Sequence, residues 1–380
     1  MNDGGTRRRK LVVVGGGYGG TRLARGLDKD MDVVLVERRD RFVHNIGAIR
    51  AVTDPSWLDA IILPYSGLLE RGQIVHDEVT GVRSGSVTLR DAGELAADYI
   101  VLAVGSSYPE PFKAGALTAH FAATMHEINA RLRTSQSVAI VGAGPVGIEL
   151  AGEIAAAYPD KAVTLVSSGS QLLPTYTHAL GRSLRRQLEE LGVHVLTDRR
   201  ALDLASKDSP FGPATVQLDD GSEITADLVF PVIGSSPSTE FLLASGVGLN
   251  KARIIVDSQL AVPGFRGVWA MGDAADTGEP MTVVSLERQV PYLIKHLRAR
   301  HVADETEYTA APYRGWPHPP IVVPLGVKHG ASQLPPRFEV GAWITSLLKG
   351  RNLLVNKAAK SLSVGKKRAR NQLTWMGTYN

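Results

Sequence analysis

The stretch LVVVGGGYGG, at residues 11–20, decides the fold, because a close copy of it, VAIVGAGPVG, returns at residues 138–147. Each copy is a run of branched aliphatic residues, followed by glycines in the spacing G-x-G-x-x-G and then by a helical sequence. In such a strand–turn–helix unit the first glycine allows a tight turn, the second lets the backbone approach a pyrophosphate, and the third lets the helix pack closely on the strand. We therefore predict two dinucleotide-binding cradles in one chain.

The first cradle has the acidic partner that a dinucleotide site requires. The next predicted strand, DVVLVE, ends on Glu37, and a carboxylate there holds the hydroxyl groups of an adenosine ribose. We expect Glu37 and its neighbour Arg38 to bind the adenosine end of a dinucleotide. The residues assigned to the turn itself are Gly15, Gly16, Gly17, Tyr18, Gly19 and Gly20.

The second cradle repeats the unit but lacks the acid. Alignment of VTLVSS with VVLVER places Ser167 where Glu37 stands. An acid would favour NADH and a nearby arginine would favour NADPH, but no arginine follows directly, so the choice stays open. Glu149, on the helix after the turn, either faces the nicotinamide or is a surface carboxylate near the positive helix end. The residues assigned to this turn are Gly142, Gly144, Pro145 and Gly147.

Three further segments complete the pattern. GFRGVWAMGDAAD (264–276) reads as a strand that ends on Gly272 and Asp273, followed by a helix start. YIVLAVGSS and LVFPVIGSSP are strands that end in small-residue turns at Gly105 and Gly234. With its two cradles, the chain resembles the FAD-dependent pyridine-nucleotide oxidoreductases of the apoptosis-inducing-factor and type II NADH dehydrogenase group. Within this group it is most similar to the ferroptosis suppressor (apoptosis-inducing factor 2) type.

This resemblance implies an α/β fold with two doubly wound Rossmann-type domains, as in glutathione reductase. FAD would occupy the first cradle, and NADH or NADPH the second. The FAD domain would comprise residues 1–110 and 247–305, with the NAD(P)H domain, 111–246, inserted between them. Residues 306–380 would form a small C-terminal region.

The resemblance also implies residues that contact the flavin cofactor. Arg50, in RFVHNIGAIRA, would contact FAD, and Val79, in EVTGV, would hold the adenine through its backbone. Asp273 would bond the ribityl chain. In KGRNLLVNKAAKSL, Lys360 would lie near the flavin, with Lys357 as the alternative.

The C-terminal region also carries an apolar helical face. Trp343, Ile344, Leu347 and Leu348 have the spacing of one side of a helix. That side either packs against the FAD domain, or contacts a membrane, or lines a path for a lipid quinone.

The composition excludes several kinds of chemistry. The 380-residue chain contains no cysteine, which excludes disulfides, thiolate catalysis and iron–sulfur ligation. Its ten histidines show no spacing typical of a metal site, so we predict no metal. There is no apolar run of about 18 residues, and no glycine follows Met1 directly. We therefore expect neither a spanning helix nor N-myristoylation, and we place the protein in the cytoplasm or at the periphery of a membrane.

The formal net charge is +4, and much of the excess lies near the two ends of the chain. We interpret these residues as solvated basic tails, with attraction to anionic lipid as the alternative. No aromatic platform or helix-turn-helix pattern supports nucleic-acid binding. The residues concerned are Arg7, Arg8, Arg9, Lys10, Lys366, Lys367, Arg368 and Arg370.

The resemblance implies an oxidoreductase that passes hydride from NAD(P)H through FAD to an acceptor, for which we favour a quinone. Glu149 and Lys360 are the expected catalytic residues, and the protein is expected to be a monomer or a homodimer. Three alternatives share the two cradles. They are a reductase for a protein carrier such as ferredoxin, a slow nucleotide-sensing flavoprotein, and an oxidoreductase of an aromatic metabolite.

Overall fold

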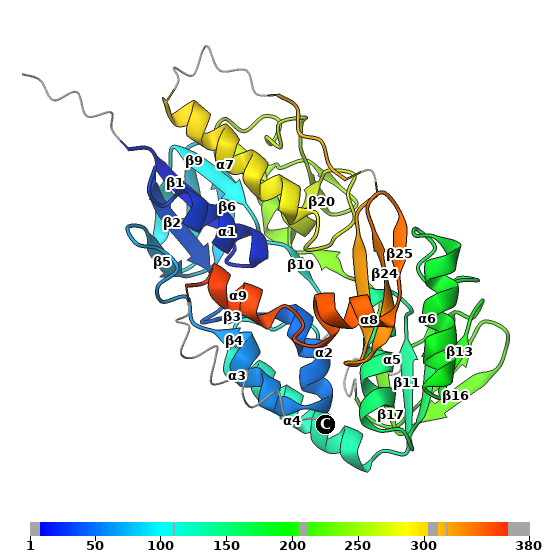
Figure 1. Ribbon diagram of the computed structural model, residues 1–380. Coiled ribbons are helices and arrows are strands. Elements are labelled where there is room, and N and C mark those ends of the chain that lie inside the picture. Colours follow the sequence, from blue (N-terminus) through cyan, green and yellow to red (C-terminus); the bar gives the residue numbers. More distant parts are fainter. Residues whose placement is uncertain (1–7, 109–110, 205–210, 303–310, 317, 364–380) are drawn as a thin grey trace, which may run out of the picture.

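Two parallel sheets form the framework of the protein in the computed structural model, which describes residues 8–108, 111–204, 211–302, 311–316 and 318–363. Each sheet carries one of the two glycine turns, after β1 or after β11 (Figure 1). The predicted pair of Rossmann-type units is confirmed. The first sheet has the spatial order β21 (Val268–Ala270), β9 (Tyr99–Leu102), β1 (Lys10–Val14), β2 (Asp32–Glu37) and β5 (Gln73–His76). The second has the order β13 (Val193–Leu196), β12 (Ala162–Val166), β11 (Ser137–Val141) and β17 (Leu228–Pro231).

The first sheet is buried on both faces, which explains the continuous apolar sequence of its strands. Leu11 and Val13 of β1 pack into the core beneath the helices α1 (Tyr18–Leu27) and α7 (Leu286–Val302). Val12 and Val14 belong to the core on the other face. A small antiparallel sheet covers that face, formed by β6 (Val79–Arg83), β7 (Ser86–Leu89) and β8 (Gly93–Ala96).

The second unit repeats this construction. Val138 and Ile140 of β11 pack into the core beneath α5 (Pro145–Ala157) and α6 (His178–Glu190). Ala139 and Val141 point to the other core. The covering sheet here consists of β14 (Ala201–Asp203), β15 (Ala214–Leu218) and β16 (Glu223–Ala226).

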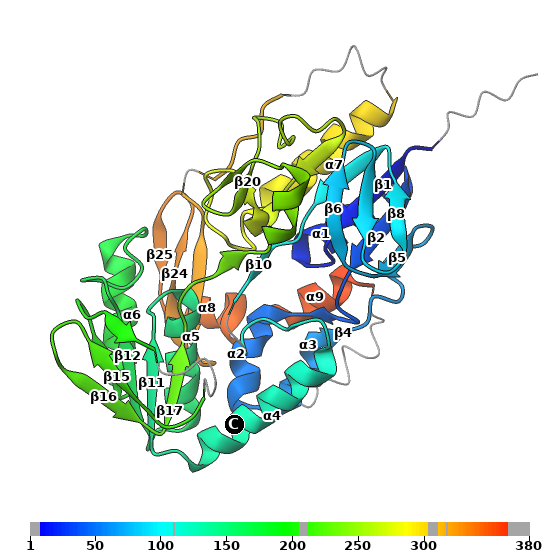
Figure 2. The ribbon, with the colours of Figure 1, turned by 180° about the vertical axis from the view of Figure 1, so that it is seen from behind.

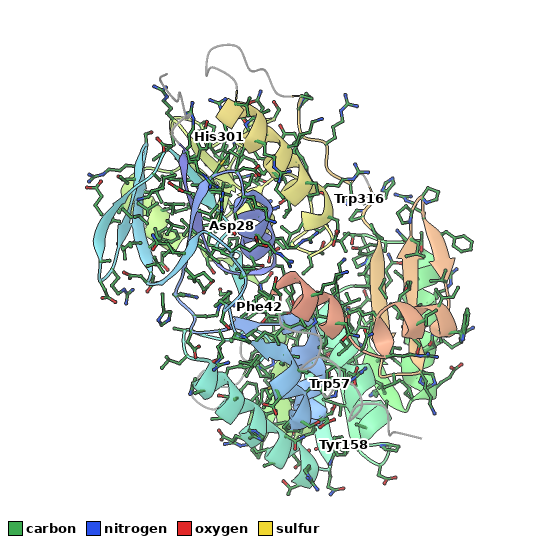
Figure 3. The ribbon with its side chains drawn as sticks, turned by 60° about the vertical axis from the view of Figure 1, so that its left-hand side comes forward. Asp28, Phe42, Trp57, Tyr158, His301 and Trp316 are labelled. Carbon is green, nitrogen blue, oxygen red and sulfur yellow. The ribbon has the colours of Figure 1, made fainter. Side chains whose placement is uncertain are left out.

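Where the chain passes between the units, β10 (Ser106–Ser107) pairs antiparallel with β18 (Ser236–Pro237). Several helices fill the junction, and one hydrophobic core includes residues from both units. Tyr158, at the end of α5, donates from its hydroxyl to the carbonyl oxygen of Thr53 at 3.3 Å (Figure 3). The elements here are β3 (Phe42–Val43), α2 (Asn45–Thr53), η1 (Pro55–Trp57), α3 (Leu58–Ile61), β4 (Ile62–Leu63) and α4 (Thr118–Thr134).

The C-terminal region lies between the two units, as both ribbon views show (Figures 1 and 2). Val323 and Leu325 join the core of the second unit, whereas Ala358 and Leu362 join the core of the first. This region therefore bridges the two units. It consists of β23 (Ile321–Leu325), β24 (His329–Leu334), β25 (Phe338–Val340), α8 (Ala342–Thr345), a π-helical turn η4 (Ser346–Gly350) and α9 (Val355–Ser361).

The helix that we expected directly after Asp273 is not there. The 3-10 turn η3 (Gly272–Ala274) leads into a short strand, β22 (Ala275–Asp276), which pairs with β20 (Arg253–Ile255). Helix α7 begins only at Leu286, although Gln289 reaches back and accepts from the backbone nitrogen of Gly272 at 2.7 Å. Elsewhere lie η2 (Glu240–Ser245) and β19 (Leu249–Asn250). Within the described ranges, we find no helix with the length and apolarity needed to cross a membrane.

Candidate functional site: two glycine cradles and a buried charge cluster

The first glycine turn has the geometry of a phosphate cradle. Gly15 has a φ of +101°, and its nitrogen donates to the carbonyl oxygen of Val36 at 2.8 Å. A Cβ on Gly20 would collide with the carbonyl oxygen of Gly15, so only glycine lets α1 start so close to the strand. Gly17 caps α1, and Tyr18 is its first residue. This arrangement aims the amide end of α1 at the turn, as anion binding requires.

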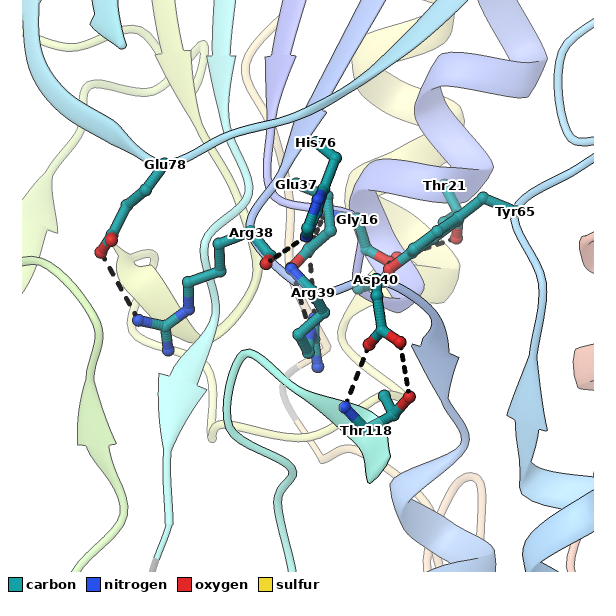
Figure 4. Close-up of polar contacts among 11 residues, drawn as sticks. Gly16, Thr21, Glu37, Arg38, Arg39, Asp40, Tyr65, His76, Glu78 and Thr118 are labelled. Carbon is teal, nitrogen blue, oxygen red and sulfur yellow. Dashed lines mark hydrogen bonds and ion pairs between the residues drawn. The ribbon is translucent and has the colours of Figure 1, made fainter. Parts of the chain in front are cut away.

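Glu37 holds the turn from its other side. Its carboxylate accepts from the nitrogen of Gly16 and pairs with Arg39 at 3.0 Å. Burial opposes ionisation of Glu37, but the charge and hydrogen bonds of Arg39 outweigh this effect, so the pKa of Glu37 is lowered. Arg39 was not expected from the sequence. Arg38 was expected at this site, but its guanidinium points to the carboxylate of Glu78, 3.7 Å away (Figure 4).

A cavity of about 250 Å³ opens beside this turn. Gly15, Glu37, Arg38 and Val79, all expected at the cofactor, are among the residues that line it. Its mixture of backbone turn, acid and base fits the adenosine and phosphate groups of a dinucleotide.

Asp273 lies at the edge of this cavity, because it shares contacts with two lining residues. The hydroxyl of Ser106 donates to Asp273 Oδ2 at 2.6 Å, and Lys113 Nζ lies 3.5 Å from the same oxygen. Ser106 follows the turn at Gly105, where φ is +68°, and the second crossing turns at Gly234, where φ is +73°. Ser106 and Lys113 carry no motif that would have identified them from the sequence.

The second glycine turn reproduces the first. Gly142 has a φ of +117°, and its nitrogen donates to the carbonyl oxygen of Val166 at 2.9 Å. Gly144 caps α5, with Pro145 as the first helical residue, and a Cβ on Gly147 would collide with the oxygen of Gly142. The acid is missing, as the sequence indicated. Ser167 is buried, and its hydroxyl bonds only within its own loop, to the backbone of Gly169 at 3.2 and 3.3 Å.

A buried cluster of four charged side chains lies where the C-terminal region meets both units. Lys349 Nζ donates to Glu149 Oε1 at 2.6 Å, with side-chain exposures of 14% and 5%. Burial raises the pKa of Glu149, and the nearby charge of Lys349 only partly offsets this. Glu153 lies one turn further along α5, and it pairs with Arg50 of α2 at 2.6 Å. The guanidinium also donates to the carbonyl oxygen of Gly350 at 2.8 Å. Both pairs therefore fasten η4 to α5.

Two expectations drawn from the family resemblance, for Arg50 and for Lys360, stay predictions, and the structure shows how these side chains lie. Arg50 does not line the cavity beside the first turn; it is buried against Glu153 and stacks over Trp57 at 4.9 Å. Lys360 is exposed on α9, and Lys357 pairs with Glu287 on the surface. The lysine that is buried beside a candidate catalytic acid is Lys349, the first residue of the segment in which Lys360 was chosen.

A chain of hydrogen bonds joins the first cradle to the C-terminal region. The nitrogen of Ile46 donates to the hydroxyl oxygen of Tyr18, which lies 3.0 Å from His44 Nδ1. His44 Nε2 lies 2.7 Å from the carbonyl oxygen of Leu353. A carbonyl only accepts, so Nε2 carries the proton and Nδ1 accepts from Tyr18. Burial lowers the pKa of His44 to about 4, which keeps the ring neutral.

The basic ends are described only in part. Arg8 donates to the carbonyl oxygens of Asp28, Lys29 and Met31, and Lys10 begins β1. Arg7 and the C-terminal basic residues lie outside the described residues. In the part of the chain that the structure describes, no group of three or more histidine and carboxylate side chains is placed to hold a metal ion.

Comparison with known proteins identifies the family of the chain. The family model "Pyridine nucleotide-disulphide oxidoreductase" matches residues 9–289. The chain is 26% identical to apoptosis-inducing factor homolog B of Dictyostelium discoideum, over 94% of this chain and 98% of that one. It is also 26% identical to ferroptosis suppressor protein 1 of Mus musculus, over 93% and 95%. The resemblance drawn from the sequence motifs is thereby confirmed.

Solved structures share the fold. NDH2 from Plasmodium falciparum in complex with NADH matches with a TM-score of 0.74 and 15% identity, over 97% of each chain. The family model spans both glycine turns, and the relatives span nearly the whole chain. The assignment to the family therefore holds although the chain contains no cysteine. The chain belongs to the pyridine nucleotide-disulphide oxidoreductase family and is an oxidoreductase.

Proposed function

We propose that the protein binds FAD in the first cradle and NAD(P)H at the second, and that it reduces a quinone. The observation that carries this proposal is the position of the Glu149–Lys349 pair, which lies largely buried where the C-terminal region bridges the two units. The similarity to ferroptosis suppressor protein 1 and to NDH2 supports the same assignment. A flavin bound in the first cradle would supply the redox chemistry, namely hydride acceptance from the reduced nicotinamide and transfer of two electrons to the acceptor.

The chain itself contributes binding, orientation and a proton. Glu37 and the first turn hold the adenosine and pyrophosphate end of FAD, with Asp273 beside the cavity for the ribityl chain. Quinone reduction consumes two protons, and Glu149 is suited to give one because burial raises its pKa. Its Oε1 accepts from Lys349, so Oε2 is the oxygen available to hold the proton.

A titration by visible absorbance tests the proposal. Purified protein should carry the absorbance of an oxidised flavin, lose it when NADH or NADPH is added without oxygen, and recover it rapidly when a short-chain quinone follows. A protein that takes up no FAD would refute the assignment of the first cradle. Slow recovery with quinone but rapid recovery with ferredoxin would exclude the quinone as acceptor.

Lys349 and Lys360 make a matched pair of variants. Lys349→Met removes the partner that holds Glu149, so it should slow quinone reduction by up to about 100-fold, the loss expected if Glu149 no longer acts as the acid, while the bound flavin is retained. Lys360→Met should leave turnover unchanged, because Lys360 is exposed on α9. The opposite result would return the catalytic lysine to the position that the resemblance suggested.

We further propose that the quinone arrives from a membrane surface through an apolar patch on the C-terminal region. The patch consists of Val327, Trp343, Leu347 and Leu348, which are between 41% and 72% exposed. Trp343 and Leu347 are four residues apart and share one helical side. Leu348 adjoins Lys349, and the backbone of Val327 accepts from Ser346 at 2.6 Å, so the patch lies against the turn that carries the catalytic lysine.

Sedimentation with lipid vesicles tests this contact. Full-length protein should bind phosphatidylcholine vesicles that contain anionic lipid, and the double variant Trp343→Ser/Leu347→Ser should lose most of this binding. Leu243→Ser is the matched control, because Leu243 is 64% exposed but lies on η2, outside the C-terminal region that carries the patch. Equal binding by all three proteins would exclude the patch as the contact surface.

A further inference from the structure

The two cradles of this chain can be compared residue by residue, because the same backbone hydrogen bond anchors each one. The nitrogen of Gly15 bonds to the oxygen of Val36 at 2.8 Å, and that of Gly142 bonds to the oxygen of Val166 at 2.9 Å. The residues that follow, Glu37 and Ser167, are therefore equivalent. The first cradle serves as an internal reference for the adenosine end of the second.

The neighbouring strands extend this equivalence. Val36 pairs with Val75 on β5, and Val166 pairs with Leu196 on β13. Three residues onward from each partner lie Glu78 and Arg199, and the backbone between differs in the second unit, where Asp198 has a φ of +55°. The preceding residues, Asp77 and Asp198, are of the same type, so they do not distinguish the two sites.

Glu78 shows what this position faces. It lines the cavity beside the first turn together with Glu37, and Figure 4 shows it across from Arg38. Arg199 stands at the same count in the second unit, beside Ser167 at the adenosine end of the second cradle. A direct contact supports this placement, since the nitrogen of Arg199 donates to the carbonyl oxygen of Ser167 at 3.0 Å.

The two sites differ in side-chain type at these two positions. The first site has two carboxylates, Glu37 paired with Arg39 and Glu78 paired with Arg38, whereas the second has a hydroxyl and a guanidinium. A carboxylate bonds ribose hydroxyls and repels a 2′-phosphate, while an arginine attracts it. Arg199 is anchored by its bond to the oxygen of Asp198 at 2.9 Å and by Asp220 at 2.5 Å, and its side chain stays 38% exposed. A phosphate dianion can replace or share this single carboxylate partner.

We propose that the second cradle selects a nucleotide with a phosphate on the 2′-oxygen of its adenosine ribose, and that Arg199 is the residue that recognises it. This inference rests on the proposed function, because it takes the second cradle to be the nicotinamide nucleotide site. It makes NADPH, rather than NADH, the electron donor of the protein.

Calorimetric binding of two nucleotide fragments tests the proposal without any turnover. The flavin-loaded protein should bind adenosine 2′,5′-bisphosphate at least about tenfold more tightly than adenosine 5′-monophosphate, the size of one charge-assisted hydrogen bond. Arg199→Ser should remove that preference. Ser167→Glu, which restores the acid of the first cradle, should reverse it. Arg186→Ser is the matched control, since Arg186 is 71% exposed and pairs with Glu190 on α6.

The outcomes separate this inference from the proposed function. Equal affinity for the two fragments, or tighter binding of the monophosphate, would overturn the role of Arg199 and leave the second cradle as a nucleotide site. A preference for the bisphosphate that persists in Arg199→Ser would overturn the choice of residue. Binding of neither fragment would refute the assignment of the second cradle, and both proposals with it.

Discussion

Arg50 and Glu153 offer the most direct test of how the units are held together. Their side chains are 6% and 7% exposed, and the guanidinium makes contacts of 2.6, 3.1 and 3.2 Å with the carboxylate. Arg50→Met would leave Glu153 buried without this partner, and breaking a buried pair in this way costs about 3–5 kcal/mol. With a urea m-value of about 3 kcal/mol/M, the midpoint of unfolding should fall by about 1–1.7 M.

The assay is urea unfolding followed by tryptophan fluorescence, since Arg50 stacks over Trp57 at 4.9 Å. Glu153→Gln in the Arg50→Met background should recover more than about 1 kcal/mol relative to the sum of the single changes, because partners in contact couple. Arg186→Met, which breaks an exposed pair, should cost less than about 0.5 kcal/mol. Additive effects at Arg50 and Glu153 would refute the buried pair. Loss of flavin with no loss of stability would instead support the cofactor contact implied by the family resemblance.

Two further predictions concern the glycine turns and His44. Gly20→Ala places a methyl group against the oxygen of Gly15, so the protein should purify without flavin absorbance, whereas Gly147→Ala should keep the flavin but fail to be reduced by nucleotide. Retained function in either would contradict the cradle geometry. The pKa of His44 falls from 6.5 to about 4 on folding. The unfolded chain therefore binds more protons between these values, and stability should fall by up to about 3 kcal/mol as pH drops through this window. His44→Gln should remove that component from unfolding free energies measured at pH 7 and pH 4.5, and an unchanged difference would refute it.

The amino-acid sequence by itself determined the features that depend on local backbone geometry. A glycine turn after a buried strand requires glycine at Gly15 and Gly20, or at Gly142 and Gly147, whatever surrounds it. Glu37 ends its strand at the position where a dinucleotide site requires an acid, and the sequence shows equally plainly that a serine, Ser167, stands at this position in the second cradle. The two-unit fold and the family followed from these patterns.

Only the tertiary structure decided which charged residues meet. Arg50 pairs with a carboxylate 103 residues away, and Lys349 with one 200 residues away. Arg199 reaches Ser167 from the loop after the neighbouring strand β13 rather than from the loop that follows Ser167. Helical spacing showed that Trp343 and Leu347 share a side, but not that this side is left exposed. Burial and pairing depend on how distant segments pack against one another, and a local pattern carries no information about which partner covers it.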